Sequence, residues 1–366
     1  MLKICAVGDI MLGEGPYYLD RGIATRYRKI GDDIFSDVHK FLQGDIIFGN
    51  LEVPLSKYSE AKGLKSKTFR GDPESIALLK DAGFNVINLA NNHFLSHGYK
   101  AAVETYNLLI ENKITPIGWN PNFRCNELCY NIFDINNIIV GFIPLCNIPT
   151  TMASGYRVLH FPNIYSNCLD NLIIKLRNEC DILIISVHWG REYIHQVSPD
   201  IKKFSRKWQD MGINLILGHG PHVLQGCENN GKSLVVYSMG NFLFDQLFMD
   251  KTRIGGIFNI NYENNDFNYT LYPTQITSQF SITSLNGSDK QKWINFYKSL
   301  CNELIYSTTI ISQSEYDTLA DKEYFEMQKN NLKYIFKHLN ELTIRSSRAL
   351  IRDGIPRLKR LLLNNI

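Results

Sequence analysis

The stretch GDPESIALLKDAGFNVINLANNH at residues 71–93 predicts a helix, a strand and a polar turn in direct succession. Asp72 is the expected N-cap and Pro73 occupies the first helical position. Apolar residues at 76, 78 and 79 give the helix one buried face, and Gly83 is its expected end. The run at 85–90 predicts a strand that ends in polar side chains. This order is typical of an α/β fold.

The same alternation recurs along the chain. Longer stretches with helical spacing separate short apolar runs at 3–8, 45–50, 138–143, 181–187, 214–218 and 233–238. Such runs predict strands that are buried on both faces, and therefore an α/β sheet with covered faces. A hairpin around the turn ENND is expected within 253–276.

Composition limits the classes of function. The chain has 366 residues, 44% of them hydrophobic, which is enough to fill a large core. A net charge of +3 excludes a general electrostatic attraction to nucleic acid. The eight cysteines are scattered, so we expect reduced, structural thiols. We also expect a cytoplasmic protein, since neither a secretory signal nor a transmembrane run of eighteen apolar residues is recognisable.

The character of the chain changes near residue 285. We predict a domain over 1–285 and a helical C-terminal extension over 286–366. The tail at 344–366 is strongly basic and has two interpretations. Its apolar face packs on the core, which the helix-breaking Gly354 and Pro356 favour, or it makes peripheral contact with the anionic inner face of a membrane.

Polar residues stand at the ends of five predicted strands. In α/β sheets, ligands bind outside the carboxyl ends of the strands, so these residues are candidates by position. Taken singly, several suit a turn or a loop, but together they form one coherent set. The predicted metal ligands are Asp9, Glu52, Asn92, His188, His219 and His222, with Asn50 as a ligand or an orienting group.

The chemistry of this set predicts a catalytic metal site. Carboxylate, carboxamide and imidazole groups without thiolates suit one or two ions of Mn, Fe or Zn. Such an ion lowers the pKa of a bound water to about 7, which favours hydrolysis. His93 is the expected catalytic proton donor.

Four further residues flank these positions and are predicted to bind substrate: Arg70, Arg191, Glu192 and Asn241. Guanidinium groups suit a phosphate or a carboxylate, so an anionic or phosphorylated small molecule or polymer is the expected partner. For Arg191, simple surface solvation is an equally good interpretation.

Six motifs resemble the CapA family, named for capsule and poly-γ-glutamate synthesis, within the calcineurin-like metallophosphoesterase superfamily. They run in order over about residues 3–245: AVGDIMLGEG, FGNLEVPLS, FRGDPESIALLKDAGFNVINLANNH, SVHWGREY, LILGHGPHVLQG and VVYSMGNFLF. The resemblance implies a four-layer α/β/β/α sandwich with a metal centre at one edge. It also implies a role in making or exporting a cell-surface polymer, with capsule-assembly machinery as a partner.

The superfamily's ligand motifs are only partly present. Met11 stands where the first motif has a histidine, and Asn50 where the second has a bridging aspartate. The last motif, Gly-His-x-His, has one extra residue here. These departures are shared by the CapA family, and they fit a single ion or a pair with altered geometry. Glu14, where a basic residue is common, is expected to shift substrate preference.

Three functions fit the sequence. The first is a metal-dependent hydrolase, most simply of a phosphoester, in the biosynthesis or export of a capsule or related polymer. The second is a hydrolase or transfer enzyme acting on amide links of a poly-γ-glutamate-type polymer. The third is a non-catalytic polymer-binding or scaffolding component of the capsule machinery.

Overall fold

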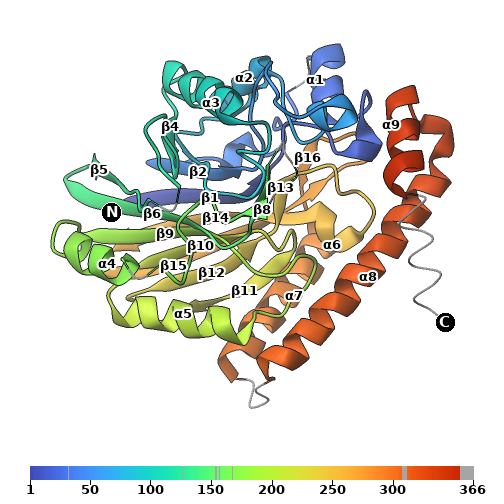
Figure 1. The fold of residues 1–366 in the computed structure, drawn as a ribbon. Coiled ribbons are helices and arrows are strands. Elements are labelled where there is room, and N and C mark those ends of the chain that lie inside the picture. Colours follow the sequence, from blue (N-terminus) through green and yellow to red (C-terminus); the bar gives the residue numbers. More distant parts are fainter. Residues whose placement is uncertain are drawn as a thin grey trace.

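The computed structural model describes the chain except for residues 32, 126, 153–154, 156, 167, 307–310 and 355–366. Two β-sheets pack face to face between layers of helices (Figure 1). In the first sheet, β1 and β2 are central and lie parallel. Its strands, in spatial order, are β16 (Ile282–Ser284), β15 (Asp266–Ile276), β14 (Ile254–Glu263), β1 (Leu2–Ile10), β2 (Ile46–Leu51), β3 (Val86–Asn88) and β4 (Thr115–Ile117), with β13 (Asn241–Leu243) paired to β1.

The second sheet has parallel strands at its centre and antiparallel strands at both edges. In spatial order it contains β11 (Leu224–Asn229), β12 (Leu234–Met239), β10 (Leu215–His219), β9 (Ile182–His188), β6 (Ile138–Cys146) and β5 (Asn131–Ile135). A small ribbon of β7 (Thr150–Thr151) and β8 (Arg157–Val158) lies apart. Each predicted apolar run is a strand, whereas the short or polar β4, β5, β11, β13 and β16 were not predicted.

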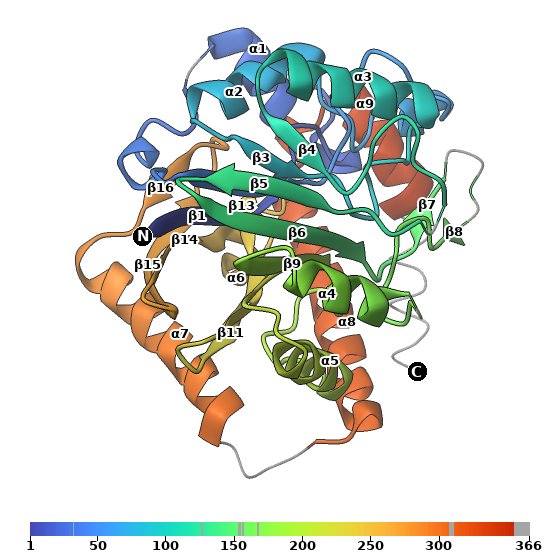
Figure 2. The same ribbon diagram turned by 90° about the vertical axis from the view of Figure 1, so that its left-hand side faces the viewer.

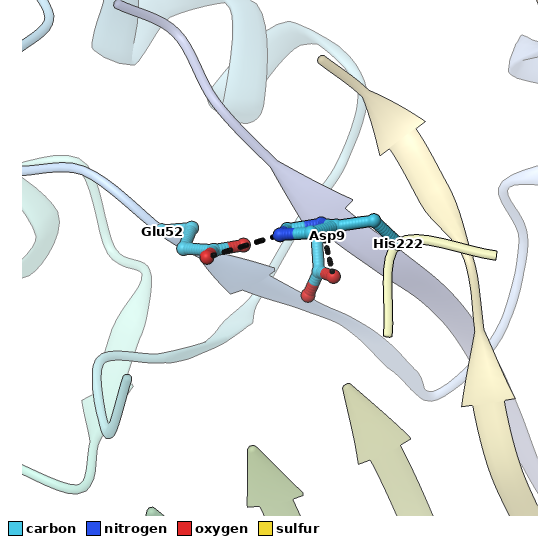
Figure 3. Close-up of side chains that lie close together, drawn as sticks. All are labelled: Asp9, Glu52 and His222. Atoms are coloured by element: carbon cyan, nitrogen blue, oxygen red, sulfur yellow. Dashed lines mark ion pairs between the residues drawn. The ribbon is translucent and has the colours of Figure 1, made fainter. Parts of the chain in front are cut away.

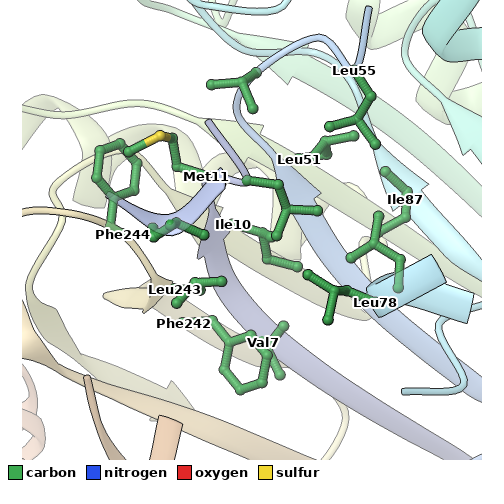
Figure 4. Close-up of a cluster of buried hydrophobic side chains, with 14 of the residues drawn as sticks. Val7, Ile10, Met11, Leu51, Leu55, Leu78, Ile87, Phe242, Leu243 and Phe244 are labelled. Carbon is green, nitrogen blue, oxygen red and sulfur yellow. The ribbon is translucent and has the colours of Figure 1, made fainter. Parts of the chain in front are cut away.

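Helices cover the outer faces of both sheets (Figure 2). The first sheet is covered by α1 (Ile23–Ile30), α2 (Ile76–Asp81) and α3 (Tyr99–Glu111), and the second by α4 (Leu169–Arg177) and α5 (Pro199–Asp210). Between the sheets, Phe48 of β2 stacks on Phe142 of β6, with ring centroids 5.9 Å apart. Figure 4 shows the core beneath the first helical layer, where Leu78 of α2 packs near Ile10 of β1. The predicted four-layer α/β/β/α sandwich is therefore confirmed.

The helix predicted near the start of residues 71–93 begins differently from the prediction. Pro73–Ser75 form a 3-10 turn before α2, and the Asp72 side chain makes no capping hydrogen bond. Asp72 instead pairs with Arg28 of α1 at 3.2 Å. The predicted end is correct, because Gly83 has a φ of +82° that an L side chain rarely adopts.

The C-terminal extension consists of α7 (Gly287–Tyr306), α8 (Gln313–Lys337) and α9 (Ile344–Ala349). Helix α7 packs on β11, and the N-terminal ends of α8 and α5 meet where Ser198 donates to Gln313 at 2.8 Å. In the tail, Ala349 and Leu350 are buried in the same core as Ile10. The other part of the tail for which membrane contact was predicted, residues 355–366 with Arg357, Lys359 and Arg360, lies outside the described residues. Among those that are described, no helix is both long and apolar enough to span a bilayer.

Candidate metal centre

The carboxyl ends of strands from both sheets meet at one edge of the sandwich. Asp9 near the end of β1 lies in register with Asn50 of β2. His188 and His219 end the neighbouring strands β9 and β10, where they lie in register. Glu52 follows β2 directly. The sheets thus bring together side chains that are up to about two hundred residues apart.

Asp9, Glu52 and His222 form the centre of this group (Figure 3). One ligand atom from each lies within 4.8 Å of the other two. His222 bridges the two carboxylates, with Nδ1 3.3 Å from Asp9 Oδ2 and Nε2 3.8 Å from Glu52 Oε1. All three side chains are buried. Donor atoms at such separations can coordinate a single metal ion.

The loop that carries His222 depends on glycine. Gly220 has a φ of +104°, and a Cβ there would lie 2.7 Å from the Trp189 carbonyl oxygen. His222 itself has a φ of +59°, which is uncommon for a residue with a side chain. The sequence GHGPH at residues 218–222 is therefore a tight turn that directs both histidines inward.

Three other predicted site residues, His188, His219 and His93, lie beside the centre. His188 Nε2 lies 3.6 Å from Glu52 Oε1, and His219 Nδ1 lies 3.5 Å from Asp9 Oδ1. His93 Nε2 is 4.0 Å from Glu52 Oε1, and about a quarter of its side chain is exposed. The Oδ1 atom of Asn92 is buried without a hydrogen-bond partner. The structure therefore brings the carboxylates and histidines of the predicted set into one cluster.

A network of amides holds the carboxylate side of the cluster. Asn50 Nδ2 donates to Asp9 Oδ1 at 2.8 Å, and Asn50 Oδ1 accepts from Asn88 at 2.9 Å and from Asn91 at 3.1 Å. Because its oxygen already accepts two hydrogen bonds, Asn50 is placed as an orienting group. Asn88 was missed from the sequence, although it interrupts an apolar strand. Asn91 also accepts from the His93 backbone N–H at 3.2 Å.

Asn241, predicted to bind substrate, contacts a histidine instead. Its Oδ1 lies 2.9 Å from His222 Nδ1, and its Nδ2 donates to the Thr252 carbonyl at 2.9 Å. This arrangement orients the His222 ring and leaves Nε2 directed toward Glu52.

Aromatic packing positions His93. The Phe69 ring stacks on the His93 imidazole with centroids 4.6 Å apart and planes 18° from parallel. The Phe69 backbone has a φ of +53°, which is costly for a bulky residue. Its N–H donates to the Glu14 carbonyl at 2.8 Å, which helps to hold that conformation.

The pKa values of Asp9 and Glu52 are shifted in opposite directions. Burial alone would raise the pKa of Asp9, but contacts with His219 and His222 hold it well below its usual value. For Glu52 burial prevails over the nearby His222 and raises the pKa well above its usual value. Burial opposes the charge of His222, yet Glu52 and Asp9 together raise its pKa to about 10. Burial lowers the pKa of His188 to about 3.

The residues present fit a divalent ion. Both carboxylate oxygens of Glu52 and both ring nitrogens of His219 are buried and accept or donate no hydrogen bond. Buried polar groups without partners are costly, so such atoms need a ligand. A cation among carboxylates and neutral imidazoles would satisfy them together.

The other residues predicted to bind substrate differ in how close they lie to the cluster and in what they contact. Glu192 lies within electrostatic reach of both Glu52 and His222. Arg70 is half-buried and donates to the Lys57 carbonyl at 3.2 Å. Arg191 points toward α8, where it pairs with Asp321 and lies 3.8 Å from Asp317. This geometry ties the loop to the C-terminal helices and does not favour substrate binding by Arg191.

Two departures from the superfamily pattern have structural explanations. Met11 is fully buried beside Phe244 in the apolar core (Figure 4), so this position supplies no ligand. Glu14 was expected to shift substrate preference, but it is buried and caps α1 through the Gly22 and Thr25 N–H groups. Its carboxylate is therefore occupied in the fold.

Comparison with known proteins identifies the family. The model for bacterial capsule synthesis protein PGA_cap matches residues 3–246. The chain belongs to this family. It is 30% identical over 258 residues to the capsule biosynthesis protein CapA of Bacillus anthracis, covering 67% of this chain and 60% of that one. It is 27% identical over 261 residues to the PGA biosynthesis protein CapA of Bacillus subtilis, covering 67% and 64%.

This chain therefore spans less than two thirds of the length of these two relatives. The predicted resemblance to the CapA family is confirmed. Among solved structures, the chain is similar to an NAD nucleotidase from Haemophilus influenzae, with a TM-score of 0.42 and 13% identity. That match covers 88% of this chain and 67% of the nucleotidase.

Proposed function

We propose that this protein is a metal-dependent hydrolase that cleaves a phosphoester during synthesis or export of a capsule or related cell-surface polymer. The family and the chemistry of the strand-end cluster support this proposal. The observation that carries it is Glu52, a buried carboxylate with no hydrogen bond that faces three histidines. A fold has no reason to retain such a group unless a ligand compensates its burial.

An ion of Mn, Fe or Zn would be held by Asp9, Glu52, Asn92, His188, His219 and His222. When bound, it polarises a phosphoryl oxygen and activates a water. Asn50 and Asn241 orient the ligands, and Glu192 adds negative charge at the cluster. Because Met11 supplies no imidazole and Asn50 no carboxylate, one ion fits the donor set better than a bridged pair.

His93 would give a proton to the leaving group. Burial, assisted by His222, lowers the pKa of His93 to about 4, so this imidazole is neutral at pH 7 before substrate binds. A bound phosphoester brings negative charge close to the ring, and a nearby anion raises the pKa of a histidine. Protonation of His93 would therefore depend on the charge of the bound substrate.

Metal content and hydrolysis together test the proposal. The wild type, the double variant His219→Ala/His222→Ala and the control His39→Ala would be compared by elemental analysis and by assay of a generic phosphoester with added manganese. We expect metal and hydrolysis to be lost in the double variant alone. Bound metal with cleavage of γ-glutamyl amides only would favour the amide alternative. Absence of metal under every reconstitution would refute catalysis and leave a polymer-binding component.

A further inference from the structure

Two cysteines that lie far apart in the sequence meet at the interface between α7 and the second sheet. Cys227 of β11 and Cys301 of α7 are 74 residues apart, and their sulfurs lie 3.5 Å from each other. Cys227 is buried, whereas Cys301 is partly exposed. No other pair among the described cysteines has its sulfurs within hydrogen-bonding distance in this structure. The scattered positions in the sequence gave no indication of this contact.

The surroundings of the pair favour attack by one sulfur. The backbone N–H of Cys227 donates to Cys301 Sγ at 3.3 Å, and Tyr269 Oη lies 2.8 Å from Cys227 Sγ. The Cys227 thiol, followed by that N–H, holds the pKa of Cys301 at about 7, while the pKa of Cys227 is raised. Cys301 is also the more accessible sulfur, so it would react first.

We propose that Cys227 and Cys301 form a reversible disulfide that fastens α7 to β11, by exchange with a small-molecule disulfide. The Cys301 thiolate attacks one sulfur of that molecule and releases its other half as a thiolate. Cys227 then loses its proton and attacks the mixed disulfide at Cys301, which releases the second half. Two protein thiols are oxidised and one external disulfide is reduced to two thiols.

Formation of the disulfide requires the two sulfurs, now 3.5 Å apart, to move closer together. A disulfide has a sulfur separation of about 2.05 Å, so the two sulfurs must approach by less than the length of a bond. Strand β11 begins two residues after His222, so the bond would fasten α7 to the strand that leaves the candidate metal centre. This inference does not depend on the proposed hydrolysis, because neither sulfur belongs to that cluster.

The test uses the full-length protein in its native state. The protein would be incubated at graded ratios of oxidised to reduced glutathione, quenched with acid, unfolded, alkylated and mapped by mass spectrometry of peptides. We expect the peptides of Cys227 and Cys301 to become linked to each other and the number of reactive thiols to fall from the eight in the sequence to six. The melting temperature of the oxidised form should rise and return on reduction.

Two variants separate this pair from the other cysteines. Cys301→Ser should abolish the linked peptide, whereas Cys168→Ser, at an exposed thiol, should leave it unchanged. Recovery of both Cys227 and Cys301 as alkylated thiols at every glutathione ratio would overturn the proposal. So would a dominant linkage that involves any other cysteine. Because the mapping is done on the wild type, a poorly folding variant would not obscure the answer.

Discussion

Glu14 and Glu52 are both buried glutamates, but their surroundings differ completely. The Glu14 carboxylate accepts hydrogen bonds of 2.8 to 3.0 Å from the backbone N–H groups of Asp20, Gly22 and Thr25. The Glu52 carboxylate accepts none, and burial raises its pKa. The fold compensates the first carboxylate and leaves the second for a ligand. Burial alone therefore does not identify a candidate ligand, whereas burial without any hydrogen bond does.

The largest effect is expected for Glu52→Gln. This variant should lose its metal and roughly 100-fold or more of any phosphoester hydrolysis, because a neutral amide is a poor ligand for a divalent ion. Without metal, its free energy of unfolding should equal or exceed that of the wild type, since an uncompensated carboxylate has been removed. Elemental analysis, the phosphoester assay and urea unfolding in a chelator check these points. Stoichiometric metal in the variant would show that Glu52 is no ligand.

Asn241→Ala should have an intermediate effect on the ion. It removes the hydrogen bond that orients His222, and loss of such a partner lowers metal affinity roughly 10- to 100-fold. Calorimetric titration with Mn²⁺ measures the change. The matched control is Asn261→Ala, an asparagine on β14 that bonds only to Asn268 among the described contacts. Equal affinity in the two variants would contradict the orienting role.

Glu14→Gln should produce the reverse of Glu52→Gln. The amide NH₂ replaces one carboxylate oxygen, so either the Asp20 N–H or the N–H groups of Gly22 and Thr25 lose their acceptor. We expect a loss of about 2 kcal/mol in the free energy of unfolding, with metal content unchanged. Urea unfolding and elemental analysis measure the two quantities. If Glu14→Gln lost the metal ion but kept the free energy of unfolding of the wild type, the proposed difference in role between Glu14 and Glu52 would be wrong.

The convergence of the strand-end residues could be predicted because sheet geometry brings them together. Asp9, His188 and His219 each end a run of apolar residues that is visible in the sequence. Parallel strands place their carboxyl ends at one edge, so position along the chain was sufficient to group these residues. The helix and strand at 71–93 could also be predicted, because the signals for them, such as Pro73 and Gly83, lie within the stretch itself.

Contacts between distant segments were not predictable in this way. For Arg191 the sequence left substrate binding and surface solvation open, because nothing in its own stretch shows that acidic residues of α8 reach it. The role of Asn241 depends on β13, a strand of only three residues beside β1. Asp72 suited a helix cap, but Arg28 competes for its carboxylate. In each case the deciding partner comes from a remote element, and local patterns carry no information about it.

Asp245 is a third kind of buried carboxylate, and the expected effect of removing its charge depends on pH. It accepts one hydrogen bond, from the Gly15 N–H at 2.5 Å, while burial, with the charge of Glu14 adding to it, raises its pKa to about 7. Between about pH 4, where an unfolded aspartate ionises, and pH 7, the folded state retains a proton that the unfolded state releases. Asp245 therefore lowers the stability progressively as the pH rises through this window, and the full cost is present above it.

Asp245→Asn keeps an acceptor for the Gly15 N–H and cannot ionise. We expect it to exceed the wild type in free energy of unfolding by about 4 kcal/mol at pH 8 and by about 1.5 kcal/mol at pH 5. Urea unfolding at both values measures the difference, with Asp250→Asn on α6 (Asp250–Arg253) as the control at an exposed aspartate. A difference that is independent of pH would mean that the Asp245 carboxylate is as well compensated by the fold as that of Glu14.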